Sequence, residues 1–285
     1  MNRRVAISRC LTALLFASTS PALPVARGQG GSTARERRVA LVIGNGEYRF
    51  SPLRNPVNDA RAVADVLRGL DFAVHHHENA GRRSMLEAIR GFVLRSRSYD
   101  VRVFYYAGHG VQVNGKNYLI PTDADIQSED DIPTKTADVT EMFERLGQIG
   151  AGTNIIILDA CRNNPFADGG TIAGDGRRLR FRGVTPAGLT PQDAPSGTLI
   201  AFATKPGAVA IDGPDANHSL YTKHLLTHLP TPGLPVEQMF KRVRLGVAQE
   251  TKYQQMPWES SSLTGDFCFN TTAGACRYDG SASAR

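Results

Sequence analysis

Residues 155–166 read IIILDACRNNPF, and this stretch determines the class of fold that the sequence predicts. An uninterrupted apolar run as long as a strand stops abruptly at polar residues, and Cys161 lies just after it. Continuous runs of Ile, Leu and Val are typical of strands buried on both faces, as in parallel sheets. In open α/β sheets, catalytic and binding groups gather beyond the carboxyl ends of the strands. We therefore expect the thiol of Cys161 to react rather than to pack in the core.

The rest of the chain alternates between strand patterns and helix patterns. Asn58 and Asp59 are expected to cap the first helix, and 111–120 is expected to form a hairpin. The loop over 167–196 is rich in Gly, Pro, Asp and Arg. The expected strands are 38–43, 72–77, 101–107, 198–204 and an edge strand at 263–269, and the expected helices are 60–68, 81–97, 137–149, 218–229 and 236–250. This alternation predicts βαβ units and an α/β fold whose mostly parallel central sheet is flanked by helices.

The first 28 residues have the pattern of a secretory signal peptide. A positively charged start precedes a short apolar segment at 11–17, and small residues and prolines lead to Gly28. This order is typical of export signals, and the apolar run is too short for a stable membrane anchor. We expect residues 1–28 to be removed, 29–36 to form a linker, and the protein to be secreted or periplasmic. A disordered or amphipathic N-terminus is the alternative, and Arg3-Arg4 leaves the export route open.

The leader also accounts for most of the positive charge. Without residues 1–28, which hold four arginines and no acidic residue, the net charge falls from +6 to +2. A nearly balanced chain gives no reason to expect nucleic acid or an anionic membrane surface as a partner.

Three cysteines follow the leader. Cys268 and Cys276 lie eight positions apart around a turn-rich segment, so they could close a small disulfide loop, as is common in exported proteins. Two unrelated thiols are the alternative. If the disulfide forms, Cys161 is left unpaired in an oxidising compartment, which marks it as a candidate reactive thiol.

A histidine at the end of another expected strand is the candidate base. His109 lies between Gly108 and Gly110, directly after the strand over 101–107. Cysteine is a nucleophile as the thiolate, and a nearby histidine can accept its proton. The amides of Gly110 and Cys161 could donate to the oxyanion of an acyl transfer. The alternative is a core histidine and an inert buried cysteine.

Two short segments carry a resemblance to a known family. YYAGHG at 105–110 and DACR at 159–162, whose His109 and Cys161 are fifty-two positions apart, resemble the catalytic motifs of the caspase superfamily, peptidase clan CD, family C14. Further segments resemble, in this order, the bacterial metacaspase-like or orthocaspase branch: LVIGN at 41–45, NPVNDA at 55–60, NYLIP at 117–121, DACRNNPF at 159–166, PSGTLIA at 195–201 and PWESS at 257–261.

The resemblance covers about residues 37–270 and implies a three-layer caspase-like fold. It divides the chain into a p20-like part (37–166), an inter-half loop (167–196), a p10-like part (197–270) and a C-terminal tail (271–285). It implies a cysteine endopeptidase in which Cys161 is the nucleophile, His109 the base and Gly110 an oxyanion donor. Backbone groups rather than an acidic side chain would steady the histidine, and no cofactor is required. The oligomeric state is left open.

One departure from the caspase signature concerns specificity. That signature has Gln two residues before the cysteine, where this chain has Asp159. Asp159 and Asp59 resemble two aspartates that form the acidic floor of the first specificity pocket in metacaspases. Two carboxylates favour a cation, and arginine can bind a carboxylate through two hydrogen bonds. We therefore predict protein or peptide substrates cleaved after Arg or Lys. The alternatives are that Asp59 only caps its helix and that Asp159 only orients its loop.

Other charged segments have more than one interpretation. RRLRFR at 177–182 is a candidate for self-cleavage or a solvated loop. The four aspartates Asp123, Asp130, Asp131 and Asp168 occur where some metacaspases bind activating Ca²⁺, whose ligands are oxygens, but we assign no metal site. The three histidines at 75–77 cannot converge simply, because successive strand residues face opposite sides. Gly44-Asn45-Gly46 lacks the third glycine of a dinucleotide motif.

Two rival functions remain at the level of sequence. The first is a caspase-like fold used as a binding or regulatory module with weak or no catalysis. The presence of both His109 and Cys161 argues against it. The second is a clan CD relative with a different preference in its first specificity pocket.

Overall fold

The centre of the molecule is a six-stranded sheet with the order β2-β1-β3-β7-β8-β9. The computed structural model describes residues 36–49, 51–114, 116–150, 152–160, 194–205, 210, 217–272 and 276. All neighbouring strands are parallel except β9, which is antiparallel to β8. The strands are β1 (Arg38–Gly44), β2 (Phe72–Glu78), β3 (Val101–Gly108), β7 (Thr153–Ala160), β8 (Thr198–Phe202) and β9 (Trp258–Ser261).

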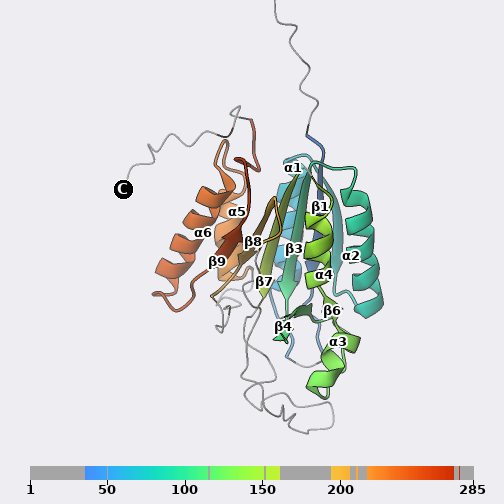
Figure 1. Cartoon of the computed structure of the whole chain (residues 1–285). Coiled ribbons are helices and arrows are strands. Elements are labelled where there is room, and N and C mark those ends of the chain that lie inside the picture. Colours follow the sequence, from blue (N-terminus) through green and yellow to red (C-terminus); the bar gives the residue numbers. More distant parts are fainter. Residues whose placement is uncertain are drawn as a thin grey trace, which may run out of the picture. The chain divides into compact units, whose positions relative to one another are not determined.

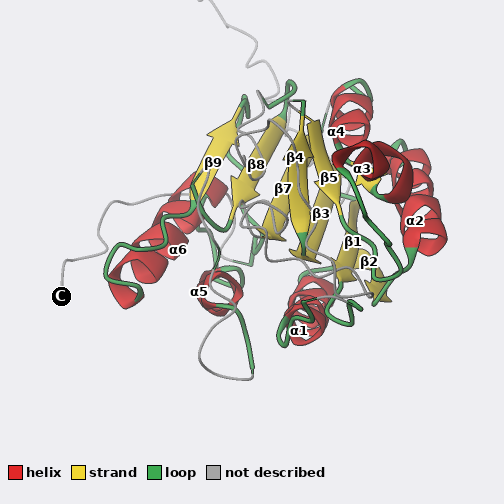
Figure 2. Ribbon diagram, turned by 90° about the horizontal axis from the view of Figure 1, so that it is seen from below, coloured by secondary structure: helices red, strands yellow, loops and turns green. Residues whose placement is uncertain are grey.

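Helices cover both faces of this sheet, as Figures 1 and 2 show. One face carries α1 (Pro56–Gly69), α5 (Leu220–His228) and α6 (Val236–Glu250), and the other carries α2 (Arg82–Ser96) and α4 (Thr140–Gly147). The predicted mostly parallel α/β fold in three layers is therefore confirmed. Among the described residues, none of the helices combines the length and apolar character that crossing a bilayer requires.

Side chains of the buried strands alternate between two apolar cores. In β1, Ala40 and Val42 pack on the side of α1, whereas Val39, Leu41 and Ile43 pack on the side of α2. All five are fully buried, because a parallel sheet covered on both faces leaves neither side of a strand to water. The continuous apolar runs that the sequence showed are thus explained by two-sided burial.

A smaller sheet lies at the carboxyl end of the central strands (Figure 1). It contains β4 (Gly110–Val113), β5 (Lys116–Leu119) and β6 (Ala137–Asp138), in that order. The strands β4 and β5 form the predicted hairpin. The acidic segment between β5 and β6 forms a 3-10 turn, η1 (Glu129–Asp131), and a short helix, α3 (Ile132–Lys135).

Two predicted helices have clearly different bounds in the structure. The first helix begins at Pro56 rather than near residue 60, because proline lacks an N–H and has a helical φ, which suit the first turn of a helix. The predicted helix 137–149 is reduced to Thr140–Gly147, since Ala137 and Asp138 pair with β5 instead.

The predicted edge strand at 263–269 is wrong. In that segment, Cys268 forms an isolated bridge with Pro235, and the sheet edge is occupied by Trp258–Ser261, which pairs with β8. This sequence, WESS, is polar and lacks the apolar alternation on which the prediction relied. An edge strand tolerates polar residues because one side of it faces solvent.

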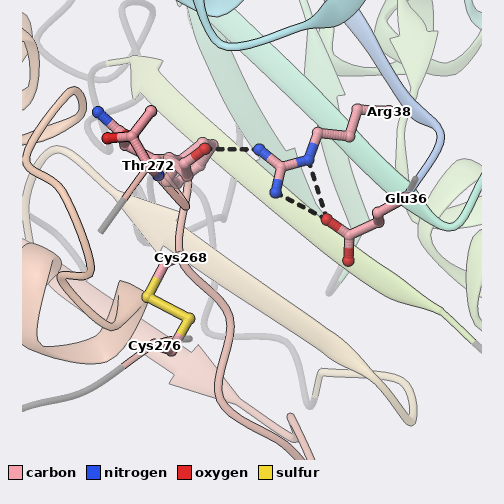
Figure 3. Close-up of a disulfide and its surroundings, with 7 residues drawn as sticks. Glu36, Arg38, Cys268, Thr272 and Cys276 are labelled. Carbon is pink, nitrogen blue, oxygen red and sulfur yellow. Dashed lines mark hydrogen bonds and ion pairs between the residues drawn. A yellow bond between two sulfur atoms is a disulfide. The ribbon is translucent and has the colours of Figure 1, made fainter. Parts of the chain in front are cut away.

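The C-terminal segment is held to the start of β1. Cys268 and Cys276 form a disulfide with Cα atoms 5.7 Å apart, so the predicted pairing is confirmed. Nearby, Arg38 Nη1 donates to the carbonyl oxygen of Phe269 at 2.5 Å, and its guanidinium pairs with Glu36 at 2.7 Å (Figure 3). The same guanidinium lies over the ring of Phe72, 5.4 Å from its centroid.

Removing the disulfide should lower stability. A double substitution, Cys268→Ser with Cys276→Ser, is expected to cost about 2–3 kcal/mol of unfolding free energy, because it removes the constraint on a short loop of the unfolded chain. Chemical denaturation would measure the change, with the wild-type protein under reducing conditions as the control. An unchanged midpoint would contradict a stabilising role.

Candidate active site

The candidate site lies at the carboxyl edge of the central sheet, where β3 and β7 end side by side. Their register pairs Ala107 with Asp159 and Gly108 with Ala160. His109 follows β3 directly. Cys161, the residue bonded to Ala160 in the sequence, lies outside the described residues. The sheet therefore brings together the strand ends that precede the two predicted catalytic residues.

Two tyrosines hold the backbone of His109. Its N–H donates to Tyr48 Oη at 2.9 Å, and its carbonyl accepts from Tyr106 Oη at 2.8 Å. The Tyr48 ring also packs on the imidazole, with ring centroids 4.5 Å apart. Burial raises the pKa of Tyr106 well above its usual value, and the neighbouring Tyr48 adds to the effect. Tyr106 therefore stays protonated and remains a hydrogen-bond donor.

The imidazole of His109 is oriented by a backbone group. Its Nε2 lies 2.7 Å from the carbonyl oxygen of Ser51, in agreement with the backbone support that the resemblance predicted. A carbonyl only accepts hydrogen bonds, so we assign the proton to Nε2. In the neutral ring, Nδ1 is then the basic nitrogen that can accept a proton from a thiol.

Gly108 is a glycine for two structural reasons. Its φ of +151° lies where side chains are strained. A Cβ built there would lie 2.6 Å from Tyr48 Oη and 2.7 Å from Tyr106 Oη. The next glycine, Gly110, opens β4 and pairs with Leu119. Its predicted role as an oxyanion donor stays a prediction.

Asp59 lies in the first turn of α1 and is 1% exposed. The prediction that it caps this helix is wrong, because the helix begins three residues earlier. Its carboxylate instead reaches the start of α5, where it accepts from His218 Nδ1 at 2.8 Å and from the Ser219 N–H at 3.2 Å. The start of α1 approaches β1 closely, since a Cβ on Gly44 would clash with the Pro56 carbonyl oxygen. This packing explains the glycine at position 44.

Asp159 is the next-to-last residue of β7 and is 7% exposed. Its Oδ2 accepts from Thr222 Oγ1 at 2.7 Å and from the hydroxyl of Ser219. Tyr105 Oη lies 2.6 Å from Thr222 Oγ1. The carboxylate is thus held by hydroxyl groups, which favour its ionised form.

Ser219 joins the two aspartates. Its N–H donates to Asp59 and its hydroxyl donates to Asp159. The same hydroxyl accepts the N–H of Thr222 at 3.0 Å and so caps α5. The two carboxylates predicted to share a pocket, which are far apart in sequence, therefore contact one residue at a helix N-terminus, where the helix dipole favours negative charge.

Two tyrosines and a histidine in the described part of the chain interact with these carboxylates, and burial affects the pKa of each. Burial, and then the charge of Asp159, raise the pKa of Tyr105 and of Tyr221 well above the usual value. Partial burial lowers the pKa of His218, which favours the neutral ring, with Nδ1–H donating to Asp59.

The acidic residues considered for calcium have local structural roles. Asp123 Oδ1 accepts the N–H of Arg82 at the start of α2, at 2.7 Å. The Asp131 carboxylate accepts the N–H groups of Gln127 and Ser128 at 2.8 and 3.0 Å. Asp168 lies outside the described residues. The described part of the chain contains no group of three or more potential metal ligands, and activation by Ca²⁺ stays untested.

The three histidines of β2 face opposite sides of the sheet. Burial is the main cause that lowers the pKa of His75 and of His77, and the positive charge of Arg95 on α2 is the second. His76 lies beside Glu78, with His76 Nε2 and Glu78 Oε1 3.5 Å apart. This alternation follows from the strand period of two residues.

Sequence reasoning missed Tyr105, His218, Ser219 and Thr222. A serine before an apolar run is a typical N-cap, so Ser219 could have been recognised as the start of α5, which was expected one residue earlier. Nothing in the local pattern showed that its hydroxyl reaches Asp159 on β7.

The architecture is that of a three-layer caspase-like domain. The crystal structure of caspase-1 from Spodoptera frugiperda matches with a TM-score of 0.59, covering 84% of this chain and 92% of that chain at 16% identity. At this identity the likeness concerns the fold alone.

Comparisons of sequence show the family. The caspase domain family, peptidase family C14, matches residues 37–268, and the chain belongs to it. Human mucosa-associated lymphoid tissue lymphoma translocation protein 1 is 32% identical over 135 residues, which cover 46% of this chain and 16% of that protein. A protein named as a probable protease from a Desulfuromonadales bacterium is 25% identical over 224 residues, or 68% of this chain and 26% of that protein. The chain thus belongs to a family of cysteine peptidases.

A pair of glycine substitutions tests the packing around His109. Gly108→Ala is expected to lower the unfolding free energy by about 2 kcal/mol or more, because it adds strain at positive φ and a steric clash. Gly69→Ala is the matched control, since no atom lies within 4 Å of a Cβ built there. It should be neutral or slightly stabilising. Equal effects of the two changes in denaturant titrations would contradict the argument.

Proposed function

We propose that the protein is a secreted or periplasmic cysteine endopeptidase that cleaves protein and peptide substrates after Arg or Lys. The observation that carries the proposal is the convergence of Asp59 and Asp159 on Ser219. Both carboxylates are buried beside the strand ends that lead to His109 and Cys161. The removal of residues 1–28 as a leader is part of the proposal.

In the proposed reaction, His109 Nδ1 accepts the proton of the Cys161 thiol. The thiolate attacks the scissile carbonyl carbon, and the N–H groups of Gly110 and Cys161 donate to the oxyanion. His109 then protonates the leaving amine, and a thioester remains on Cys161. Water attacks the thioester with His109 as base, which releases the carboxylic acid and restores the thiol. The residues of the chain supply every proton transfer, so the proposal requires no cofactor.

The preference for a basic residue follows from charge. A buried carboxylate interacts strongly with a cation because the surroundings screen little. Arginine can also bind a carboxylate through two parallel hydrogen bonds. An aspartate side chain entering the same pocket would be repelled by Asp59 and Asp159. We therefore expect discrimination against acidic residues as well as selection of basic ones.

A fluorogenic peptide panel tests this specificity. Peptides with Arg or Lys at the cleaved position should be hydrolysed, and those with Asp or Asn should not. Asp159→Ala should lower kcat/KM for the arginyl peptide by about 100-fold or more, as expected when one partner of a buried charge pair is removed. Cys161→Ala is the inactive control. Each assay is run with and without calcium, which also tests activation by that ion.

Two outcomes would contradict the proposal. Full activity of Asp159→Ala on arginyl peptides would overturn the assignment of the pocket. No hydrolysis of any peptide by the wild-type protein, with or without calcium, would favour a caspase-like binding module.

Self-cleavage at the basic segment RRLRFR, residues 177–182, is a further expectation of this specificity. The segment lies outside the described residues. Intact-mass analysis of the purified wild-type protein should show two fragments separated within 177–182, whereas Cys161→Ala should remain whole. Identical intact masses for the two proteins would count against processing.

A further inference from the structure

A directional chain of hydroxyl groups ends at Asp159. A carboxylate only accepts hydrogen bonds, so the hydroxyl hydrogen of Thr222 is donated to Asp159 Oδ2, at 2.7 Å. Because that hydrogen is used, Thr222 Oγ1 must accept in its contact with Tyr105 Oη, at 2.6 Å. The phenol of Tyr105 is therefore the donor at the start of the chain.

The members of this chain come from separate elements and are deeply buried. Tyr105 lies on β3, Thr222 in the first turn of α5 and Asp159 on β7. Tyr105 and Thr222 are both 0% exposed, so water cannot replace either donor. Burial keeps the pKa of Tyr105 well above its usual value, and the phenol therefore retains its proton throughout the neutral pH range.

We infer that Tyr105 and Thr222 are positioning residues that hold the Asp159 carboxylate in the orientation that binds the basic side chain of the substrate. The inference rests on the proposed function, because it assigns a support to the same pocket. Without these donors the carboxylate loses hydrogen bonds that favour its charged form and a single orientation. The loss should weaken binding of a cation and leave the chemistry at Cys161 unaffected.

The chain offers a matched control in Tyr221. Like Tyr105, it is almost fully buried, and burial and the charge of Asp159 raise its pKa. Among the described residues, however, its hydroxyl has no hydrogen-bond partner. Replacing either tyrosine by phenylalanine removes one buried hydroxyl near Asp159, but only Tyr105→Phe breaks the chain of donors.

The experiment compares Tyr105→Phe, Tyr221→Phe, Thr222→Val and Thr222→Ser in the full-length protein. For each variant, kcat and KM are measured on an arginyl peptide. The inhibition constant of agmatine, a guanidinium compound with no bond to cleave, is measured as well. Circular dichroism and thermal unfolding show whether each variant is folded.

In Thr222→Val, loss of the donor to the charged carboxylate should raise KM and the agmatine inhibition constant roughly 10-fold. Tyr105→Phe removes the donor to the neutral hydroxyl of Thr222, so the rise should be smaller, roughly 3-fold. The kcat of both variants should stay within about 2-fold of the wild-type value, since the reacting atoms are not altered. Tyr221→Phe should behave as the wild-type protein, and Thr222→Ser should as well, because it keeps the hydroxyl.

Three results would overturn the inference while leaving the proposed function intact. These are an unchanged agmatine constant in Tyr105→Phe, an equal change in Tyr221→Phe, and a failure of Thr222→Ser to preserve binding. Failure of the proposed function can be distinguished from failure of this inference, because the wild-type protein itself would then not cleave after Arg or Lys. That result would overturn the inference too.

Discussion

The hydrogen bonds of Ser219 to Asp59 and Asp159 are the interactions on which the candidate site depends. A carboxylate buried away from water is stable as an anion only when donors surround it. Ser219 supplies an N–H to one carboxylate and a hydroxyl to the other, and it also caps α5. One residue thereby connects α1, β7 and α5, so the p20-like and p10-like parts of the chain both contribute to the predicted pocket.

The two central strands carry candidate groups for both the reaction and the specificity. On β3, Tyr105 points toward Thr222 and Asp159, while His109 follows the end of the same strand. On β7, Asp159 lies two residues before Cys161 in the sequence. Because the strands are parallel and in register, displacement of either would move a group of the pocket and a candidate catalytic group together.

The fold is shared with a caspase at only 16% identity, so the layered sheet tolerates wide changes of side chain. The buried polar groups around His109 are instead held by specific partners. Tyr48 and Tyr106 bind the backbone of His109, and Gly108 leaves room for both phenols. Each of these groups needs a partner of fixed position, since an unpaired buried polar atom costs free energy.

The sequence by itself determined the class of fold, because the strand 155–158 and its neighbours carry continuous apolar runs that only two-sided burial explains. Local motifs that resemble those of the caspase superfamily also made His109, Cys161 and the two aspartates candidates, and spacing made a Cys268–Cys276 disulfide one of two alternatives. Only the tertiary structure decided that Ser219, Thr222 and Tyr105 support Asp159, and that Trp258–Ser261 forms the sheet edge. The physical reason is that hydrogen bonds between distant segments, and pairing at an exposed edge, leave no periodic trace in the local sequence.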